Sequence, residues 1–415
     1  MMCSARSVVS RSACFALVLL VCSTRLALAE VFVRWDLNQV PSPQSLGIST
    51  LVVRGANGKT IKAALARGYR VYVEADAAKP GPAPAGASMA GVIAPKHGAK
   101  WPHVRTNWVT KNKDVLQVTG RSSQPWIENN AALIRILQAG APNATPVVTY
   151  DWQPITLSDA DEGPSLEDYL VAIAESGSFG GDLVLPLHER FQKRLLAGEP
   201  DARAEWTEIK RYLEFYSWDL VNRYRPIANI GVVAAQPMVW FEAMNLMARH
   251  NLPFAIIPPD KLNEAGLENL KLVIVLDKPI GQALAALDAF GRKGGKVRTV
   301  DKALSDPNAF ALEMRKLLGA DDRVIDIWNG ITVLTAPYAA HEGGTVLVTA
   351  LNYAHQPLPV QLRVKGTFSV VHYESPEDGV SLLSPQHRNG YTEFVLPALR
   401  VGGRVFLGQT GRMDR

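Results

Sequence analysis

Apolar residues in the first 225 positions follow two spacings, one typical of buried strands and one typical of helices. Short apolar runs rich in β-branched residues predict strands at residues 31–36, 50–54 and 69–74. Between the last two runs, residues 59–67 have helical spacing and are followed by Gly68, a residue common just after helix ends. Strand, helix and strand in this order predict a parallel sheet.

The same alternation continues to about residue 225, with one interruption. Two strand-like pieces around a polar turn predict a β-hairpin over residues 107–119. Ser165 and Asp168 have the spacing of a capping box, which predicts that a helix begins there and continues through Glu175. The other predicted elements are helices over residues 128–139 and 202–224 and strands over residues 146–151 and 182–187.

Two further domains are predicted after residue 225. Strands and helices alternate again over residues 226–320, which predicts a doubly wound unit of flavodoxin-like size. Over residues 321–415 the helical spacing ends, and short strands separated by Gly, Pro and Asn predict a small β-sandwich. The predicted fold class is therefore α/β, with an irregular or truncated TIM-like barrel over residues 30–225 followed by these two domains.

The first 29 residues have the composition of a secretory signal peptide. Arg6 and Arg11 precede a short apolar run at residues 13–22, and Ala27 and Ala29 have the small-x-small spacing of a cleavage site. The apolar run is too short to span a bilayer permanently. We expect cleavage after Ala29 and an exported protein, periplasmic or extracellular, with no stable membrane span; an uncleaved anchor is the alternative.

Composition narrows the class of protein. The 415 residues are 47% hydrophobic and 20% charged, which is typical of a globular chain of two or three domains. Cys3, Cys14 and Cys22 all lie in the signal segment, so the mature chain is expected to have no disulfide, no thiolate metal site and no cysteine nucleophile. The segment also carries three arginines and no acid, so the net charge falls from +5 to about +2 on cleavage. With no basic run, nucleic acid is not an expected partner.

The order of domains resembles that of the bacterial β-galactosidases of the trimerising type, which have an α/β barrel, a flavodoxin-like domain and a small β domain. Residues 229–234, 252–258, 272–276 and the Gly-Gly turn at residues 290–295 resemble the trimerisation-type domain. Residues 346–353, which end in Asn352-Tyr353, resemble the strand that opens the C-terminal β domain of glycosidases. The resemblance implies a glycoside-hydrolase-like protein with a carbohydrate ligand, and it is compatible with a homo-oligomer.

Acidic residues at the ends of the predicted barrel strands are candidates for catalysis of glycoside hydrolysis. The reaction needs two carboxyl groups across one bond, and in a barrel these lie at the carboxyl ends of strands. We expect Asp151 and Glu74 to be the catalytic pair, and Asp36 and Glu189 to contact substrate. An acid directly after a strand is also commonly a helix cap or a solvated loop residue.

Aromatic residues beside these acids are candidates for stacking on sugar rings. Trp152 follows the predicted strand at residues 146–151, and Trp126 and Glu128 precede a predicted helix. We expect all three to contact substrate. The structural alternative is that Trp126 is a core residue and that Glu128 complements the helix dipole.

Arg54 ends an apolar strand, so its charge must either be paired or face a ligand. We include Arg54 among the substrate-binding candidates. The alternative is a structural ion pair with Glu74 or Asp36.

Other site chemistries lack their required spacing. Gly55, Gly58, Lys59 and Thr60 do not have the spacing of a phosphate-binding loop. The eight histidines are scattered without a His-Glu-x-x-His pattern, and residues 159–162 lack calcium-loop spacing. No Gly-x-Ser-x-Gly elbow is present. We therefore expect no cofactor and no metal.

Two alternatives to an active glycosidase remain. The Asn-Glu pair that marks the catalytic strand of many barrel glycosidases is absent, and residues 30–225 are short for eight βα units, which usually take roughly 250 residues. One alternative is a non-catalytic carbohydrate-binding protein. The other is a scaffold in which the middle domain forms an oligomer.

Overall fold

The computed structural model describes residues 31–54, 57–74, 87–90, 99–112, 115–142, 144–153, 161–277, 279–300 and 304–409. The predicted signal peptide and its three cysteines lie outside these residues, as do Gly55 and Asp159. No helix in the described ranges is long and apolar enough to cross a membrane.

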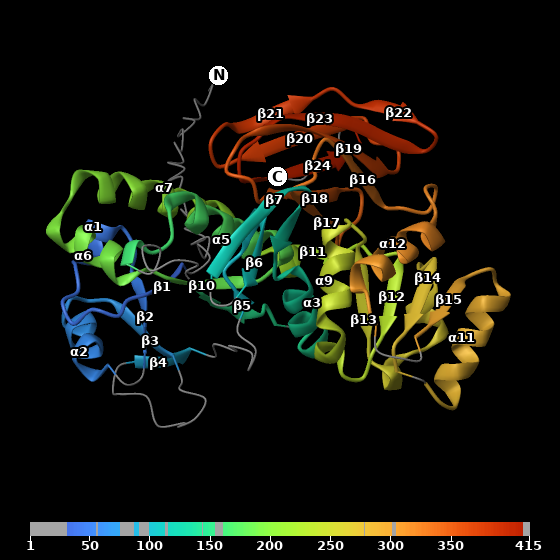
Figure 1. Ribbon diagram of the computed structural model, residues 1–415, viewed down its shortest axis with the longest axis horizontal. Helices are drawn as coiled ribbons and strands as arrows, with labels where there is room; N and C mark the ends of the chain where they lie inside the picture. The colour runs from blue at the N-terminus through green and yellow to red at the C-terminus, as the bar shows by residue number, and fades with distance from the viewer. Residues whose placement is uncertain are drawn as a thin grey trace, which may run out of the picture.

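A six-stranded parallel sheet forms the N-terminal part of the molecule, in the order β4-β3-β2-β1-β10-β8 (Figure 1). The sheet is a half-barrel, so the predicted truncated TIM-like barrel is confirmed. A separate parallel pair, β5 with β9, lies beside it. The strands are β1 Phe32–Arg34, β2 Thr50–Arg54, β3 Arg70–Glu74, β4 Ala87–Ala90, β5 Ala99–Lys100, β8 Val147–Val148, β9 Tyr150–Asp151 and β10 Asp182–Pro186.

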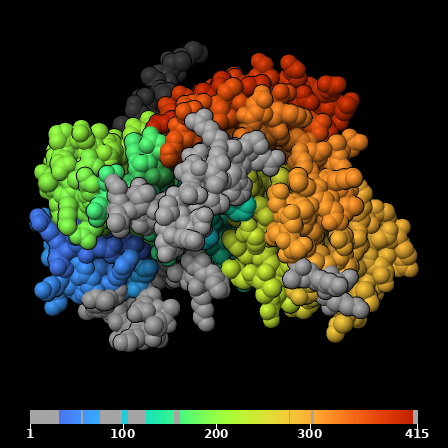
Figure 2. Space-filling model, viewed as in Figure 1, coloured from blue at the N-terminus to red at the C-terminus, as the bar shows by residue number. Residues whose placement is uncertain are grey.

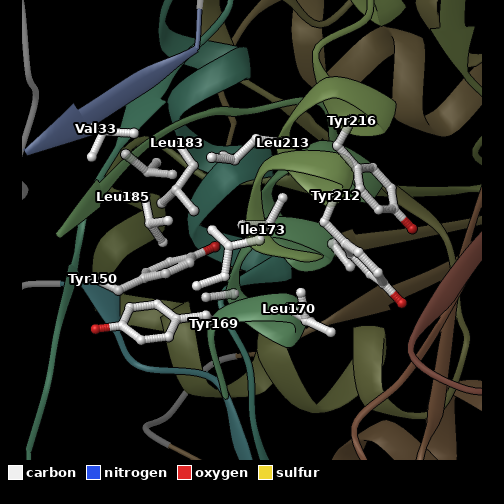
Figure 3. Packing of buried hydrophobic residues seen from close by; sticks show 14 of the residues in the cluster. Val33, Tyr150, Tyr169, Leu170, Ile173, Leu183, Leu185, Tyr212, Leu213 and Tyr216 are labelled. Atoms are coloured by element: carbon white, nitrogen blue, oxygen red, sulfur yellow. The ribbon is translucent and has the colours of Figure 1, made fainter. Parts of the chain in front are cut away.

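The half-barrel has a continuous apolar core because its central strands are buried on both faces. Leu51, Val52 and Val53 of β2 have no exposed surface, as expected for a parallel strand covered by helices. Figure 3 shows Ile173 of α5 on the side of Leu183 and Leu185 of β10, whereas Leu170 of the same helix lies on the side of Tyr212. The helices of this part are α1 Pro43–Leu46, α2 Gly58–Ala66, α3 Ala131–Gly140, α5 Leu166–Phe179, α6 Glu189–Ala197, α7 Pro200–Tyr216 and α8 Leu220–Arg223.

Helix α5 begins at the predicted capping box. The Ser165 side chain accepts a hydrogen bond from the backbone N–H of Asp168, and the Asp168 carboxylate accepts one from the backbone N–H of Ser165. The helix is buried along most of its length, because it lies between the half-barrel and the C-terminal strands. It therefore joins two parts of the molecule.

Two predicted elements differ from the observed ones. The hairpin is longer than expected, since β6 spans His103–Asn112 and β7 spans Val115–Glu128. The helix predicted over residues 202–224 is present but ends earlier, because α7 spans Pro200–Tyr216. The short helix α8 follows, and β11 (Tyr224–Pro226) pairs with the C-terminal strand β17. The expected domain boundary at residues 225 and 226 falls within β11.

The middle of the chain forms a four-stranded parallel sheet in the order β13-β12-β14-β15. Strands β12, β13 and β14 are apolar, the edge strand β15 is mostly exposed, and the amphipathic helices pack as one layer on each face. The elements are β12 Ile230–Val233, η1 Pro237–Trp240, α9 Phe241–Arg249, β13 Phe254–Ile257, η2 Pro259–Lys261, α10 Glu264–Leu267, β14 Leu272–Val275, α11 Gln282–Arg292, β15 Lys296–Thr299 and α12 Pro307–Leu318.

Two antiparallel sheets form the C-terminal sandwich, which lies at the top of Figure 1. The larger has the order β11-β17-β18-β24-β20-β21 and the smaller the order β16-β19-β23-β22. Alternate residues of both sheets fill the core between them. The strands are β16 Ile325–Trp328, β17 Val333–Ala340, β18 Val346–Asn352, β19 Leu358–Lys365, β20 Val370–Ser375, β21 Gly379–Leu383, β22 Gln386–Arg388, β23 Tyr391–Leu399 and β24 Gly402–Gly408.

A fully buried carboxylate joins the sandwich to the half-barrel. Glu175 of α5 accepts hydrogen bonds from the Tyr353 hydroxyl at 2.6 Å and from the backbone N–H and side-chain amide of Asn130 at 2.9 and 2.7 Å. Burial raises the pKa of Glu175, and these donors oppose the rise. Tyr353 belongs to the Asn352-Tyr353 segment of the predicted resemblance, and its role here is structural.

Candidate functional site

Four charged side chains meet at the carboxyl ends of β1, β2 and β3, and we call them the charge cluster: Arg34, Asp36, Arg54 and Glu74. Arg34 contacts both acids, with its Nε 3.5 Å from Asp36 and its Nη1 3.7 Å from Glu74. Arg54 Nε lies 3.5 Å from the other oxygen of Asp36. The structure therefore brings together three residues that were predicted separately as site residues.

Strand register explains this convergence. Arg54 is opposite Glu74 in the β2–β3 ladder, and Arg34 is opposite Val52 in the β1–β2 ladder. Parallel strands end at the same edge of a sheet, so their terminal side chains share one rim. The charge cluster occupies the rim where barrel enzymes place their sites.

The backbone after β1 is fixed by two amide side chains. Gln192 of α6 has no exposed surface, and its Oε1 accepts hydrogen bonds from the backbone N–H groups of Asp36 and Leu37 at 3.1 and 3.3 Å. Asn57 donates to the carbonyl oxygen of Asp36 at 2.8 Å. Asp36 is thus held in place on a rigid support.

Exposure differs within the charge cluster. The Arg34 and Glu74 side chains are 10% and 17% exposed, whereas Asp36 and Arg54 are 31% and 58% exposed. Arg34 Nε and Glu74 Oε2 are buried and have no hydrogen-bond partner within the described residues. Because buried polar atoms are usually hydrogen-bonded, these two atoms leave capacity for water or a ligand group.

The other side of the half-barrel carries aromatic side chains around Trp101. The Trp101 ring makes edge contacts with Tyr150, Trp152 and Tyr169, at centroid distances of 6.4, 5.6 and 5.5 Å. Trp152 is only half-buried, which leaves part of its ring surface accessible. Asp151, next to it, is exposed, and its backbone is opposite Lys100 of β5.

The expected pair of Asp151 and Glu74 lies on strands that are not neighbours in the half-barrel. Glu74 ends β3, whereas Asp151 ends β9. Strand β9 directly follows β8, which is four positions from β3 in the six-stranded sheet. Asp36 is nearer to Glu74. Because both contact one guanidinium group, their carboxylates are no more than about 9.5 Å apart, the upper end of the range for glycosidase carboxyl pairs.

The remaining candidates lie away from the charge cluster. Trp126 is in β7, where it packs against the core of the middle sheet with the Arg249 guanidinium 5.0 Å from its ring centroid. Glu128 ends β7 and pairs with Lys100 Nζ at 3.3 Å. Both precede α3, as predicted, but they lie in a strand: β7 continues to Glu128, and the helix begins at Ala131 and not at residue 128.

Glu189 is the first residue of α6, and its side chain is 61% exposed. It pairs with Lys193 one helical turn later at 2.6 Å, which lowers the pKa of Glu189. These contacts match the ordinary role of an acid at a helix start.

Arg34 and Gln192 were not predicted as site residues. Arg34 could have been found by the argument applied to Arg54, since it is a charged residue inside an apolar run. Gln192 gave no such signal, because nothing in the sequence places α6 beside β1. Within the described ranges no group of three or more His, Cys, Asp or Glu residues is arranged to hold a metal ion.

Comparison with known proteins supports the fold. No protein-family model and no curated protein matches the sequence. The alpha-L-fucosidase isoenzyme 2 from Paenibacillus thiaminolyticus is similar in structure, with a TM-score of 0.55, 10% identity, and coverage of 91% of this chain and 99% of that one. At this identity the similarity shows a shared fold.

Two larger proteins also match over part of their length. A GH42 beta-galactosidase from G. stearothermophilus has a TM-score of 0.41 at 8% identity, covering 67% of this chain and 56% of that one. The exo-carrageenase GH42 from Bacteroides ovatus has a TM-score of 0.40 at 9% identity, covering 85% and 53%. This chain thus spans little more than half the length of either.

Proposed function

We propose that the protein is an exported carbohydrate-active enzyme that hydrolyses a glycosidic bond at the charge cluster. The observation that carries the proposal is the pair of carboxylates, Asp36 and Glu74, held on the buried Arg34 at the carboxyl ends of barrel strands. The fold shared with an alpha-L-fucosidase supports it.

Glu74 is the central residue of the proposed reaction. One carboxyl group donates a proton to the leaving oxygen, and the other, as a carboxylate, activates water or attacks the anomeric carbon. Asp36 and Asp151 are the two candidates for the second group. Asp36 shares Arg34 with Glu74, whereas Asp151 lies beside Trp152 on the other side of the half-barrel.

Arg54 and Trp152 supply the remaining contacts. Arg54 is the most exposed member of the charge cluster, so its guanidinium is available to sugar hydroxyl groups. Trp152 offers an accessible ring surface for stacking on a sugar. A sugar chain that spans the rim would reach from one to the other.

A second function, carbohydrate binding without hydrolysis, is favoured by one observation. Both carboxylates are already held in ion pairs, Glu74 by Arg34 and Asp36 by Arg34 and Arg54, and such a network can be purely structural. Hydrolysis requires one carboxyl group that donates a proton. If neither Asp36 nor Glu74 can do so, the charge cluster holds a sugar and leaves the bond intact.

A carbohydrate screen of the mature chain, residues 30–415, separates the two functions. Thermal shift reports binding, and reducing-sugar release reports hydrolysis. Loss of release in Glu74→Gln supports the enzyme. Loss of release in one of the two single variants Asp36→Asn and Asp151→Asn identifies the second carboxylate. Binding without release supports the binding protein. Neither binding nor release with any glycan would contradict both proposals.

A further inference from the structure

A second candidate binding surface lies on the outer face of the four-stranded sheet β16-β19-β23-β22. Trp328, Gln361 and Val395 are directly opposite one another across three strands. Cross-strand neighbours share a face of a sheet. The preceding or following residues on the same strands, Ile327, Leu362 and Phe394, point into the sandwich core. The row of Trp328, Gln361 and Val395 therefore faces outward, away from the half-barrel (Figure 1).

The row has an exposed aromatic residue at one end. Trp328 is 41% exposed and Val395 is 50% exposed. The Arg363 guanidinium lies 5.4 Å from the Trp328 ring centroid and 4.3 Å from that of Tyr391. The arginine stiffens the tryptophan from one side and leaves part of its ring surface open to a ligand.

Positive charge exceeds negative charge next to this aromatic residue. Asp326 is 2% exposed and accepts hydrogen bonds from three arginines, Arg315 at 3.0 Å and Arg323 and Arg363 at 2.5 Å each. One carboxylate cannot neutralise three guanidinium groups. Arg363 Nε is also buried without a hydrogen-bond partner within the described residues.

The same face continues with further charged residues. In the next rows Arg363 is opposite Glu393, and Lys365 is opposite Tyr391, which is opposite Arg388. The Lys365 ammonium lies 3.9 Å from the Asp322 carboxylate. It also donates a hydrogen bond to the backbone carbonyl oxygen of Asp321. Arg315, Arg323, Arg363, Lys365 and Arg388 outnumber Asp321, Asp322, Asp326 and Glu393 by one charge, so this face carries a small excess of positive charge.

We propose that this face binds an acidic polysaccharide, with a sugar ring stacked on Trp328 and a carboxylate or sulfate group paired with Arg363 and Arg323. A purely structural role, the anchoring of α12, explains Arg315, because this arginine also donates to the carbonyl oxygen of His250. That structural role does not explain why Trp328 is exposed. The surface is separate from the charge cluster, so it does not depend on the proposed hydrolysis.

Retention of the mature chain on immobilised polysaccharides tests this surface. Polygalacturonate provides carboxylates, heparin provides sulfates, and dextran is the neutral control. We expect retention on at least one acidic matrix, weakened by salt because the contacts are ionic. Retention by only one matrix identifies the acidic group. Equal behaviour on dextran and both acidic matrices would overturn the proposal.

Variants connect retention to the residues. We expect Trp328→Ala and Arg363→Gln each to weaken binding at least about twofold. Val380, an apolar residue on β21 of the other sheet, is 64% exposed, and Val380→Ala is the control that should bind as the wild type does. Trp328→Ala is a surface change, so it keeps the test valid if Arg363→Gln folds poorly. Unchanged retention of Trp328→Ala, or lost retention of Glu74→Gln, would overturn the proposal.

Discussion

Arg34 is the residue on which the charge cluster depends. It is the only member that contacts both acids, and its side chain is 10% exposed. Removing one partner of a buried ion pair leaves uncompensated charge, which costs far more than losing an exposed pair. Arg34 therefore links the stability of the rim to its proposed chemistry.

We expect Arg34→Met to lower the free energy of unfolding by about 2 to 4 kcal/mol, because it leaves Asp36 and Glu74 without their shared cation. Arg54→Met is the matched control. The Arg54 side chain is 58% exposed, so its loss should cost under about 1 kcal/mol. Urea unfolding measures both, and equal costs would show that Arg34 does not hold the acids.

Asp182, at the start of β10, should make the free energy of unfolding depend on pH. Burial and the nearby Asp219 raise its pKa from 3.8 to about 6. Because the folded pKa is the higher one, the unfolded chain loses this proton first. Stability therefore falls as pH rises between about 3.8 and 6, and the penalty is complete above that range.

Asp182→Asn should accordingly raise the free energy of unfolding by about 2 kcal/mol at pH 8 and have little effect below pH 3.8. Chemical denaturation at the two pH values measures the difference. The exposed Asp260 provides a control, since Asp260→Asn should show no such change. A gain for Asp182→Asn that is the same at both pH values would contradict the assignment.

The contact of Tyr353 with Glu175 should be worth about 1 to 3 kcal/mol. Tyr353→Phe removes a donor from a fully buried carboxylate, which leaves that oxygen short of a partner. We expect lower stability with unchanged secondary structure, measured by thermal and urea unfolding. A loss below about 0.5 kcal/mol would show that water replaces the hydroxyl.

At the scale of elements, helix α5 is shaped by what surrounds it. It contacts α7 on one side and β18 on another, so its residues are small where the neighbours are close. A Cβ at Gly177 would lie 2.6 Å from the Tyr216 ring. Gly291 in α11 has nothing within 4 Å of the same position.

These two glycines therefore differ in the expected effect of one substitution. Gly177→Ala should destabilise the protein by about 1 to 3 kcal/mol through overpacking against Tyr216. Gly291→Ala should stabilise it by up to about 1 kcal/mol, because alanine is the better helix former. Differential scanning calorimetry measures both, and a gain for Gly177→Ala would mean that the Tyr216 ring moves freely.

Local patterns in the sequence predicted elements better than they predicted pairings between them. The capping box at Ser165 and the hairpin were found because their signals are local. The break after Tyr216 was missed, since β11 is stabilised by pairing with β17 more than a hundred residues later. Asp36, Arg54 and Glu74 were identified at strand ends, but their meeting around Arg34 depends on sheet order and register.

The whole molecule is a half-barrel with two further units packed on it, and its fold is similar to that of the alpha-L-fucosidase. In the space-filling view of Figure 2 the half-barrel, the middle unit and the sandwich adjoin one another. Asn130, Glu175 and Tyr353 form buried hydrogen bonds across one of these junctions. The incomplete barrel is thus joined to the sandwich by buried hydrogen bonds.

Release of reducing sugar by the mature chain and by two matched variants tests the central proposal most directly. Glu74→Gln removes the buried carboxylate of the charge cluster, and Glu189→Gln removes an exposed one on α6. We expect Glu74→Gln to lower the rate at least about a hundredfold and Glu189→Gln to leave it unchanged. Full activity of Glu74→Gln, or no release by the wild type from any glycan, would contradict hydrolysis at this site.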